Sequence, residues 1–273
     1  MARGKSVRAL VREGTDPGPL RDQGVEIVPG NMLDPPSLDR AMDGASALIT
    51  SAAGYTRRKP GDTLVMVDDL GNRNLIDAAR KARLGRFVFT SILTCELARD
   101  VPHFWQKKLT EDYLAASGVP FVALRPGAFL SLQYWGKGLK KGSIPALGSA
   151  TERWTVIHPD DVARCLALAV DEPRALGRRI DLGADRPVST KDFADMCTKL
   201  LGREIKVRVL PVGIVGVVGL FIPRMRDFGT MIRYFMRGTY IANTTVQAEL
   251  FGPVPIFEES LRRTLKEAGM LEA

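Results

Sequence analysis

The sequence predicts an α/β fold: a doubly wound parallel sheet of the Rossmann type with a mostly helical C-terminal cap on the substrate side. Short apolar segments alternate with stretches of helical periodicity through the first two thirds of the chain. These segments are almost continuously hydrophobic, which is typical of parallel strands buried on both faces. With 273 residues, 45% hydrophobic and 26% charged, the chain suits a globular domain and excludes a disordered or collagenous protein.

The alternating pattern places each element in order. The predicted strands are 6–12, 25–28, 45–51, 86–91, 121–125, 156–157, 179–182 and 205–210. The predicted helices are 64–83, 105–117, 159–170, 190–201 and 257–268, and the chain after 210 is expected to be mostly helical. Residues 137–150 are expected to form a Gly- and Lys-containing loop. Because no long polar linker occurs, we expect a nucleotide-binding core over 1–130 and a substrate-side region over 131–273, both packed on one sheet.

Cysteine and histidine usage excludes several kinds of site. The three cysteines, Cys95, Cys165 and Cys197, lie far apart, which excludes a disulfide scaffold and a CxxC site. They are expected to be reduced and internal, as in a cytoplasmic protein, and no signal-peptide pattern opens the chain. With two histidines in the sequence, an HExxH zinc site is excluded and no metal is expected.

The charge balance favours anionic partners. Lys and Arg number 39 against 31 Asp and Glu, a formal net charge of +8. The basic residues are scattered, and no zinc finger, RNP motif or helix-turn-helix occurs, so no nucleic-acid partner is expected. A phosphorylated cofactor or a membrane surface fits the same charge.

A long apolar run lies in the C-terminal region. Leu210–Ile222 spans thirteen residues, too few for a membrane-spanning helix, which needs about 20. The spacing of Met225, Phe228, Ile232 and Phe235 then predicts an amphipathic helix. This region caps a pocket, forms a homodimer face, or uses residues 212–240 to contact a membrane or partner.

The start of the chain departs from the usual doubly wound pattern. No GxGxxG pattern follows the first predicted strand, although such turns carry dinucleotide phosphates in these folds. Gly4 suits a helix C-cap directly before that strand, so we expect the first strand–helix unit, about 25–30 residues, to be missing. Strands 6–12 and 45–51 then either pair directly or leave a gap with two unpaired edges. Gly4-Lys5-Ser6 resembles the end of a P-loop, but a strand rather than a helix follows it.

Several ordered segments together resemble a known family. They are GKSVRALVR at 4–12, GNMLD with SL and Ala at 30–41, FVFTS at 87–91, Lys107 with Glu111, SG at 117–118, LRPGAF at 124–129 and DVA at 161–163. In this order and spacing, the chain resembles the atypical short-chain dehydrogenase/reductases, specifically their NmrA-like NAD(P)-binding branch. Asn31 replaces an aspartate that is usual in that family.

The resemblance implies a cofactor site along the carboxyl edge of the sheet. Arg12, just past a strand, would pair with the 2′-phosphate of NADP, whereas an acid there would favour NAD. NADP is therefore expected rather than NAD. The residues implied in cofactor binding are Arg12, Asn31, Met32, Ser51, Ala52, Ala53, Thr90, Ser91, Lys107, Pro126, Gly127, Ala128 and Phe129.

Lys107 is the main catalytic candidate. In the wider superfamily a Tyr-xxx-Lys pair shares one helix face, but His103 stands four residues before Lys107 and Phe104 four before Lys108. Either His103 donates the proton, since its unperturbed pKa suits that task, or Lys107 acts alone. The alternative is a surface ion pair between Lys107 and Glu111, with His103 merely starting the helix. His158 is likewise expected to start a helix rather than bind substrate.

Three functions follow from these observations. The first is an NADP-dependent oxidoreductase acting on a small carbonyl, enone or quinone. The second is a non-catalytic NADP-binding redox sensor like some NmrA-like proteins, which the missing tyrosine favours. The third is an accessory protein resembling the dehydrogenase-like subunit of respiratory complex I.

Overall fold

The structure is a computed structural model that describes residues 4–56, 61–132, 135–213 and 223–272, with side chains left undescribed at 223–227. Its strands are β1 (Arg8–Val11), β2 (Glu26–Pro29), β3 (Ala47–Thr50), β4 (Arg86–Thr90), β5 (Phe121–Pro126), β6 (Ala128–Phe129), β7 (Ser143–Leu147), β8 (Arg153–Trp154), β9 (Val156–Ile157), β10 (Arg179–Leu182), β11 (Val188–Ser189) and β12 (Lys206–Leu210). Its helices are α1 (Gly18–Arg21), α2 (Pro35–Met42), α3 (Asn72–Lys81), α4 (Pro102–Ala116), α5 (Gly136–Lys140), α6 (Pro159–Ala169), α7 (Thr190–Leu201), α9 (Pro223–Phe235), α10 (Thr245–Phe251) and α11 (Phe257–Glu267).

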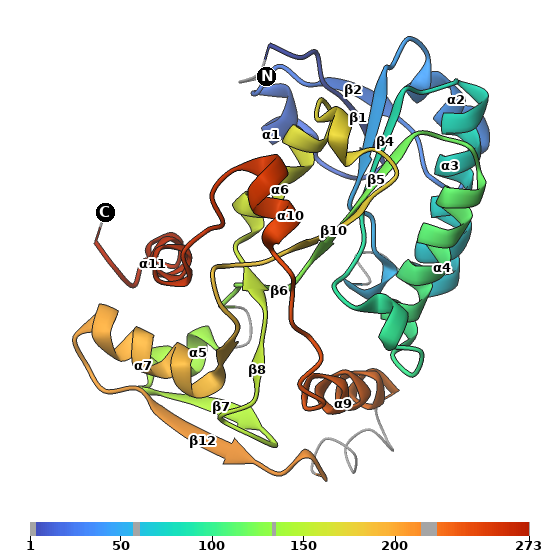
Figure 1. Cartoon of the computed structure of the whole chain (residues 1–273). Coiled ribbons are helices and arrows are strands. Elements are labelled where there is room, and N and C mark those ends of the chain that lie inside the picture. The colour runs from blue at the N-terminus through green and yellow to red at the C-terminus, as the bar shows by residue number, and fades with distance from the viewer. Residues whose placement is uncertain (1–3, 57–60, 133–134, 214–222, 273) are drawn as a thin grey trace.

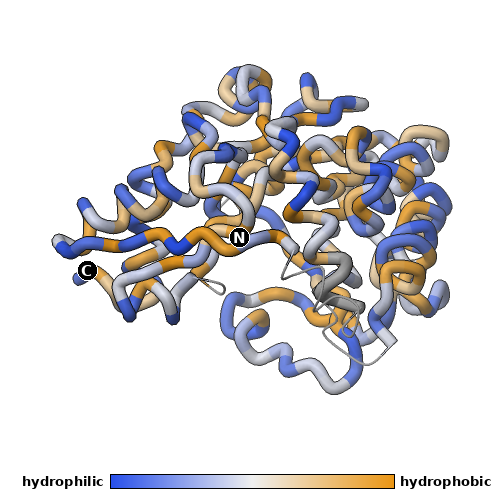
Figure 2. The backbone as a smooth tube through the Cα atoms, turned by 90° about the horizontal axis from the view of Figure 1, so that it is seen from below, coloured by the Kyte–Doolittle hydropathy of each residue, from blue (hydrophilic) through white to orange (hydrophobic). Residues whose placement is uncertain are grey.

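The central sheet has four parallel strands in the order β10-β5-β4-β3. Helices α2, α3 and α4 lie on one side of it, and α6 and α10 lie on the other (Figure 1). Alternate strand residues face the two layers: Phe87 and Phe89 pack with α3, and Val88 packs with α6. The helices carry hydrophilic and hydrophobic residues in alternation along the tube, as expected when one helix face covers a sheet (Figure 2). The predicted doubly wound parallel fold is confirmed.

Strands β1 and β2 form a separate two-stranded parallel sheet. Among the described residues β1 pairs with β2 alone and β3 with β4 alone, so of the two expected arrangements the gap is the correct one. Ile49 of β3 is accordingly 45% exposed, unusually high for the middle of a sheet strand. The sheet is therefore interrupted between β1 and β3.

Helix packing and side-chain contacts hold the small sheet in place. Leu10 and Met32 pack against the core formed by α2, α3 and the central strands. The Arg8 guanidinium donates to the Asp43 carbonyl oxygen at 2.7 Å, and the Asn74 amide donates to that of Met32 at 3.0 Å. These contacts, rather than ladder hydrogen bonds, orient β1 and β2 beside the main sheet.

The C-terminal half differs from the prediction in detail. The expected loop over 137–150 is wrong, because it contains most of α5 and all of β7, which pairs in parallel with β12. The predicted helix over 64–83 begins as a π-helical segment, Leu64–Gly71, and continues as α3. Helices α1 and α2 have no counterpart in the predicted set, while α10 lies in the C-terminal region that was expected to be mostly helical.

The predicted amphipathic helix is α9. Its Tyr234 is fully buried, and Met231 and Phe235 pack against a cluster that includes Leu93 and Phe104. At least part of the apolar face of α9 therefore packs against the rest of this chain. Residues 214–222 of the apolar run lie outside the described residues, and no helix among the described residues is long and apolar enough to span a membrane.

The three cysteines are free and buried, as predicted. Burial raises the pKa of the Cys95 thiol and of the Cys197 thiol to about 12, and that of Cys165 to about 11. All three therefore stay protonated near neutral pH, and none has the thiolate character that a nucleophile or metal ligand needs.

Candidate functional site

The predicted site residues meet at the carboxyl edge of the parallel strands. This edge is where open α/β sheets bind ligands, because loops leave the strands there while helices cover both faces. Arg12 follows β1, Asn31 and Met32 follow β2, and Ser51–Ala53 follow β3. Thr90 ends β4, Ser91 follows it, and the 126–129 segment runs from the end of β5 into β6.

Lys107 is a buried cation at this edge. Its side chain is 9% exposed, and its Nζ donates to the Ala52 carbonyl oxygen at 2.9 Å. The same nitrogen lies 3.4 Å from Asp68 Oδ1 and 4.9 Å from the centre of the Phe89 ring. An ammonium has three N–H groups, so these two oxygen acceptors leave donor capacity at the end of β3.

Asp68 holds this lysine from the π-helical segment. Its carboxylate is 1% exposed and accepts a 2.6 Å hydrogen bond from the Gly54 backbone N–H. A Cβ at Gly54 would lie 2.4 Å from the Thr63 carbonyl oxygen, so only glycine permits this close approach. Burial raises the pKa of the Asp68 carboxyl, against the attraction of Lys107, and burial lowers the pKa of the Lys107 ammonium.

Glu111 belongs to a different cluster, so the expected surface pair between it and Lys107 is wrong. Glu111 is fully buried and accepts from Arg125 at 2.9 and 2.7 Å and from Arg179 Nε at 2.8 Å. Arg125 also pairs with Glu96 at 3.0 Å. The i,i+4 spacing put both residues on the buried face of α4, where each has its own long-range partners.

His103 lies one helical turn before Lys107, as the sequence indicates. Its ring stacks on Tyr55 with centroids 4.1 Å apart and meets Phe104 edge-on at 4.7 Å. Burial, and secondarily the charge of Lys107, lower the pKa of His103 to about 4. The premise of an unperturbed pKa is therefore wrong, and the imidazole is neutral at pH 7.

The polar groups near the ends of β4 and β5 differ in whether they have hydrogen-bond partners. The Thr90 hydroxyl is buried without a hydrogen-bond partner among the described residues, while the Ser91 hydroxyl lies 3.8 Å from the Cys95 sulfur. The Gly127 N–H donates to the Leu182 carbonyl oxygen and the Ala128 N–H to that of Thr155, each at 2.9 Å. Around β4 and β5, Thr90 therefore has the spare hydrogen-bonding capacity.

The 126–129 segment is shaped by close packing. A Cβ at Gly127 would lie 2.6 Å from the Thr155 carbonyl oxygen, so this position requires glycine for the approach of β9. Phe129 is 52% exposed. The assignment of the 126–129 segment to cofactor binding stays a prediction.

The adenosine side of the predicted site lies over β1 and β2. The Asn31 side chain accepts from the Leu33 N–H at 3.0 Å, and Met32 packs against Gly71 at the start of α3. Arg12 is one-third exposed and forms a two-point ion pair with Asp62, at 2.6 and 3.2 Å. The expected phosphate-binding arginine is thus engaged by a carboxylate.

The described residues fit the two ends of a dinucleotide better than its middle. Arg12 suits a phosphate, while Lys107 and the unpartnered Thr90 hydroxyl suit a ribose with hydroxyl groups. Within the described part, β1 is followed by a loop and the four-residue α1, with no glycine-rich turn onto a long helix. The sequence has one GxxGxxG spacing, at 213–219 in the apolar run, and residues 214–222 lie outside the described part.

His158 starts α6, which confirms the helix-start interpretation. Its Nδ1 accepts from the Asp160 N–H at 3.2 Å, so Nε2, which lies 3.3 Å from a Glu267 oxygen, carries a proton. His158, Asp160 and Glu267 are close enough to hold a metal ion. The helix cap, however, leaves an N–H rather than a lone pair on Nε2, which has no hydrogen-bond partner among the described residues.

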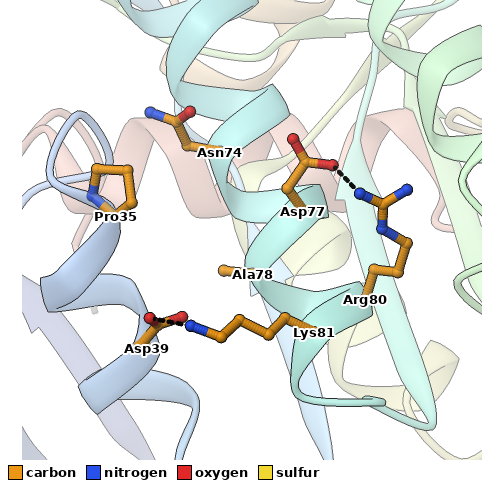
Figure 3. A pocket seen from close by; sticks show the side chains of 7 residues that line it. All are labelled: Pro35, Asp39, Asn74, Asp77, Ala78, Arg80 and Lys81. Atoms are coloured by element: carbon orange, nitrogen blue, oxygen red, sulfur yellow. Dashed lines mark hydrogen bonds and ion pairs between the residues drawn. The ribbon is translucent and has the colours of Figure 1, made fainter.

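A surface hollow lies between α2 and α3 (Figure 3), and Lys107 is not among the residues that line it. Its charged side chains pair with one another, Asp39 with Lys81 at 2.5 Å and Asp77 with Arg80 at 3.2 Å. Since the charges are compensated and the hollow is open, the carboxyl edge remains the better candidate site.

Three residues at this edge are absent from the predicted set. They are Tyr55, Asp62 and Asp68. Asp68 had a signal in the sequence, because it lies four residues after Leu64, on the apolar face of the helical pattern, where a carboxylate is unexpected. Tyr55 lies in a short 3-10 helix, Gly54–Thr56, and Asp62 lies just before the π-helical segment, and no periodic pattern in the sequence specifies the contacts of either.

Comparison with known proteins supports the same class. The model of a family described as NAD(P)H-binding matches residues 1–173. The chain is 27% identical over 271 residues to the photosystem II assembly factor Ycf39 of Cyanophora paradoxa, covering 96% of this chain and 79% of the relative. It spans less than two thirds of the length of some other curated relatives, 63% and 65%.

Solved structures share the fold at low identity. Triphenylmethane reductase of Citrobacter sp., complexed with NADP(H), superposes with a TM-score of 0.79 at 18% identity, covering 94% of this chain and 90% of that one. The NADPH-dependent quinone oxidoreductase QOR2 of Escherichia coli, complexed with NADPH, gives 0.76 at 20% identity, with coverages of 94% and 89%. These likenesses concern the fold.

Proposed function

Since this chain belongs to the NAD(P)H-binding family, we propose that it is a reductase that binds NADPH at the carboxyl edge of its sheet and acts on a small carbonyl, enone or quinone. The observation that carries the proposal is the buried Lys107 ammonium, held by Asp68 and the Ala52 carbonyl oxygen where β3 ends. A buried cation with a perturbed pKa at a ligand-binding edge is typical of a functional site.

The roles of the residues follow from their donors. Lys107 would donate to the ribose hydroxyls, Arg12 would pair with the 2′-phosphate, and the Thr90 hydroxyl would gain a partner. Bound NADPH supplies a hydride. His103 is neutral at pH 7, so the Lys107 ammonium is the better placed group to polarise a substrate oxygen.

A second candidate function is a non-catalytic assembly or regulatory role. It is favoured by the interrupted sheet and by the lack, in the described residues, of a glycine-rich turn after β1. The likeness to an assembly factor points the same way. The expected homodimer, the cytoplasmic location and the partner contact through 212–240 stay predictions.

Titration with NADPH tests the first function. We expect the wild-type chain to bind NADPH, and Lys107→Met to weaken binding about tenfold or more, since a charge-assisted hydrogen bond is worth about 1.5–3 kcal/mol. Isothermal calorimetry measures both affinities, and NADPH oxidation with a panel of quinones and enones measures turnover.

Lys108→Met is the matched control. Lys108 is the next residue on α4 and pairs with Asp112 at the helix surface, so its loss should leave NADPH affinity within about twofold. Equal affinities for all three proteins would contradict the role of Lys107. A folded wild-type chain that binds no NADPH would contradict the reductase and favour the second function.

A further inference from the structure

Arg12 and Asp62 form a geometrically complete ion pair. Arg12 Nη1 donates to Asp62 Oδ1 at 2.6 Å, and Arg12 Nη2 donates to Asp62 Oδ2 at 3.2 Å. The Asp62 side chain is 12% exposed and the Arg12 side chain 34% exposed. Both terminal nitrogens of the guanidinium therefore face one carboxylate in a partly buried setting.

A carboxylate and a phosphate present the same face to arginine. Each offers two oxygens to the two parallel N–H groups of the guanidinium fork, and each compensates its charge. The Asp62 carboxylate thus occupies the donors that a phosphate on Arg12 would use. The two anions cannot both take these donors.

We propose that Asp62 is a specificity-determining residue that competes with the nucleotide 2′-phosphate for Arg12. The inference rests on the proposed function in one respect, the placement of the adenosine 2′-position beside Arg12. A nucleotide with a 2′-phosphate must either displace the Asp62 carboxylate from these two donors or bind the remaining N–H groups beside its negative charge, whereas one with a free 2′-hydroxyl leaves the ion pair intact. Asp62 therefore narrows the preference for NADPH over NADH that Arg12 alone would produce.

The same ion pair also has a structural consequence. Asp62 precedes the π-helical segment and Arg12 follows β1, so the pair connects the small β1–β2 sheet to the segment between β3 and α3. A purely structural role would lower stability on mutation without changing the discrimination between nucleotides. Ligand discrimination is thus the informative measurement.

The test uses two small probes that differ at the 2′-position. Adenosine 2′,5′-bisphosphate and adenosine 5′-monophosphate are titrated into the full chain by calorimetry, with wild type and Asp62→Asn compared. We expect Asp62→Asn to bind the bisphosphate about tenfold more tightly than wild type does, and the monophosphate within about twofold. Arg12→Gln combined with Asp62→Asn should abolish the gain.

Glu26→Gln is the control for net charge. It removes one negative charge from the same small sheet, where Glu26 pairs with Arg8 at 2.9 Å, without contacting Arg12. We expect it to change neither affinity. If Asp62→Asn tightens both probes equally, or tightens neither, the inference is overturned, and so it is if neither probe binds to either protein.

The two proposals fail separately. A chain that binds NADPH through Lys107 while Asp62→Asn shows no selective gain rejects the competition alone. A selective gain in Asp62→Asn, with NADPH affinity independent of Lys107, rejects the proposed role of the lysine and leaves the competition standing.

Discussion

Two buried ionic clusters lie one helical turn apart on α4, and they are built differently. Glu111 is fully buried and is matched by two guanidinium groups through three hydrogen bonds of 2.7–2.9 Å. Lys107 is matched by one carboxylate at 3.4 Å and one carbonyl oxygen at 2.9 Å. The first cluster satisfies its charges within the protein, and the second leaves donor capacity at the ligand edge.

This difference separates a structural cluster from a candidate site. A buried carboxylate with several strong donors is a stable junction between α4, β5 and β10. A lysine whose pKa is lowered by burial has given up part of its solvation without full replacement. Such under-compensated groups cluster at functional sites.

Replacing Glu111 breaks the better-satisfied cluster and should have the largest effect. We expect Glu111→Gln to lower the free energy of unfolding by about 3–5 kcal/mol, because two arginines that cannot lose their protons remain near an uncharged amide. Urea denaturation measures the change. Asp112→Asn, half exposed at the next position, should cost less than about 1 kcal/mol, and a similar loss in both variants would refute the distinction.

His103, one helical turn before Lys107, should make the stability of the protein depend on pH. The unfolded His103 takes up a proton near pH 6.5, but the folded one resists until about pH 4. Stability therefore falls as the pH drops through this window, by about 3 kcal/mol from this residue, and this contribution is fully present above pH 6.5.

Denaturation of wild type and His103→Phe between pH 7 and pH 4 measures this contribution. Phenylalanine keeps a ring against Tyr55 but takes up no proton, so its stability should fall less steeply over the window. Parallel pH profiles for the two proteins would show that His103 is not the titrating group.

Asp68→Asn should have the smallest effect of the three. Lys107 loses its carboxylate partner but can shed its proton, which an arginine cannot do, so we expect a loss of about 1–3 kcal/mol near pH 7. The cost should shrink toward pH 10, since a lysine with a lowered pKa becomes neutral in the folded state before the unfolded one. Urea denaturation at both pH values decides this, and a cost that grows with pH would contradict it.

Local patterns predicted most of the nucleotide-binding core. The strand at 86–91, the helix ended by Gly118 and the strand at 121–125 follow from apolar runs and a glycine with positive φ, and each lies within a few residues of its predicted bounds. In the C-terminal half the strand at 205–210 was predicted and is β12, but β7 was missed, because it is stabilised by pairing with the distant β12.

The sequence indicated where the candidate site residues lie, but not which residues they form ion pairs with. Residues at the ends of parallel strands must converge at one edge, so Arg12 and Thr90 could be placed from topology, and Lys107 from the family resemblance. Which counter-charge each cation meets depends on segments far away in the chain. Asp62 lies 50 positions from Arg12, and Arg179 lies 68 from Glu111.

The sequence by itself thus determined the doubly wound architecture, the cofactor class and the edge at which the candidate site residues lie, because strand periodicity and ordered motifs are local properties. The tertiary structure decided the interruption between β1 and β3, the neutral state of His103, and the pairing of Lys107 with Asp68 rather than Glu111. These depend on burial and on long-range contacts, which set the dielectric surroundings and partner of each charge only when the chain is folded.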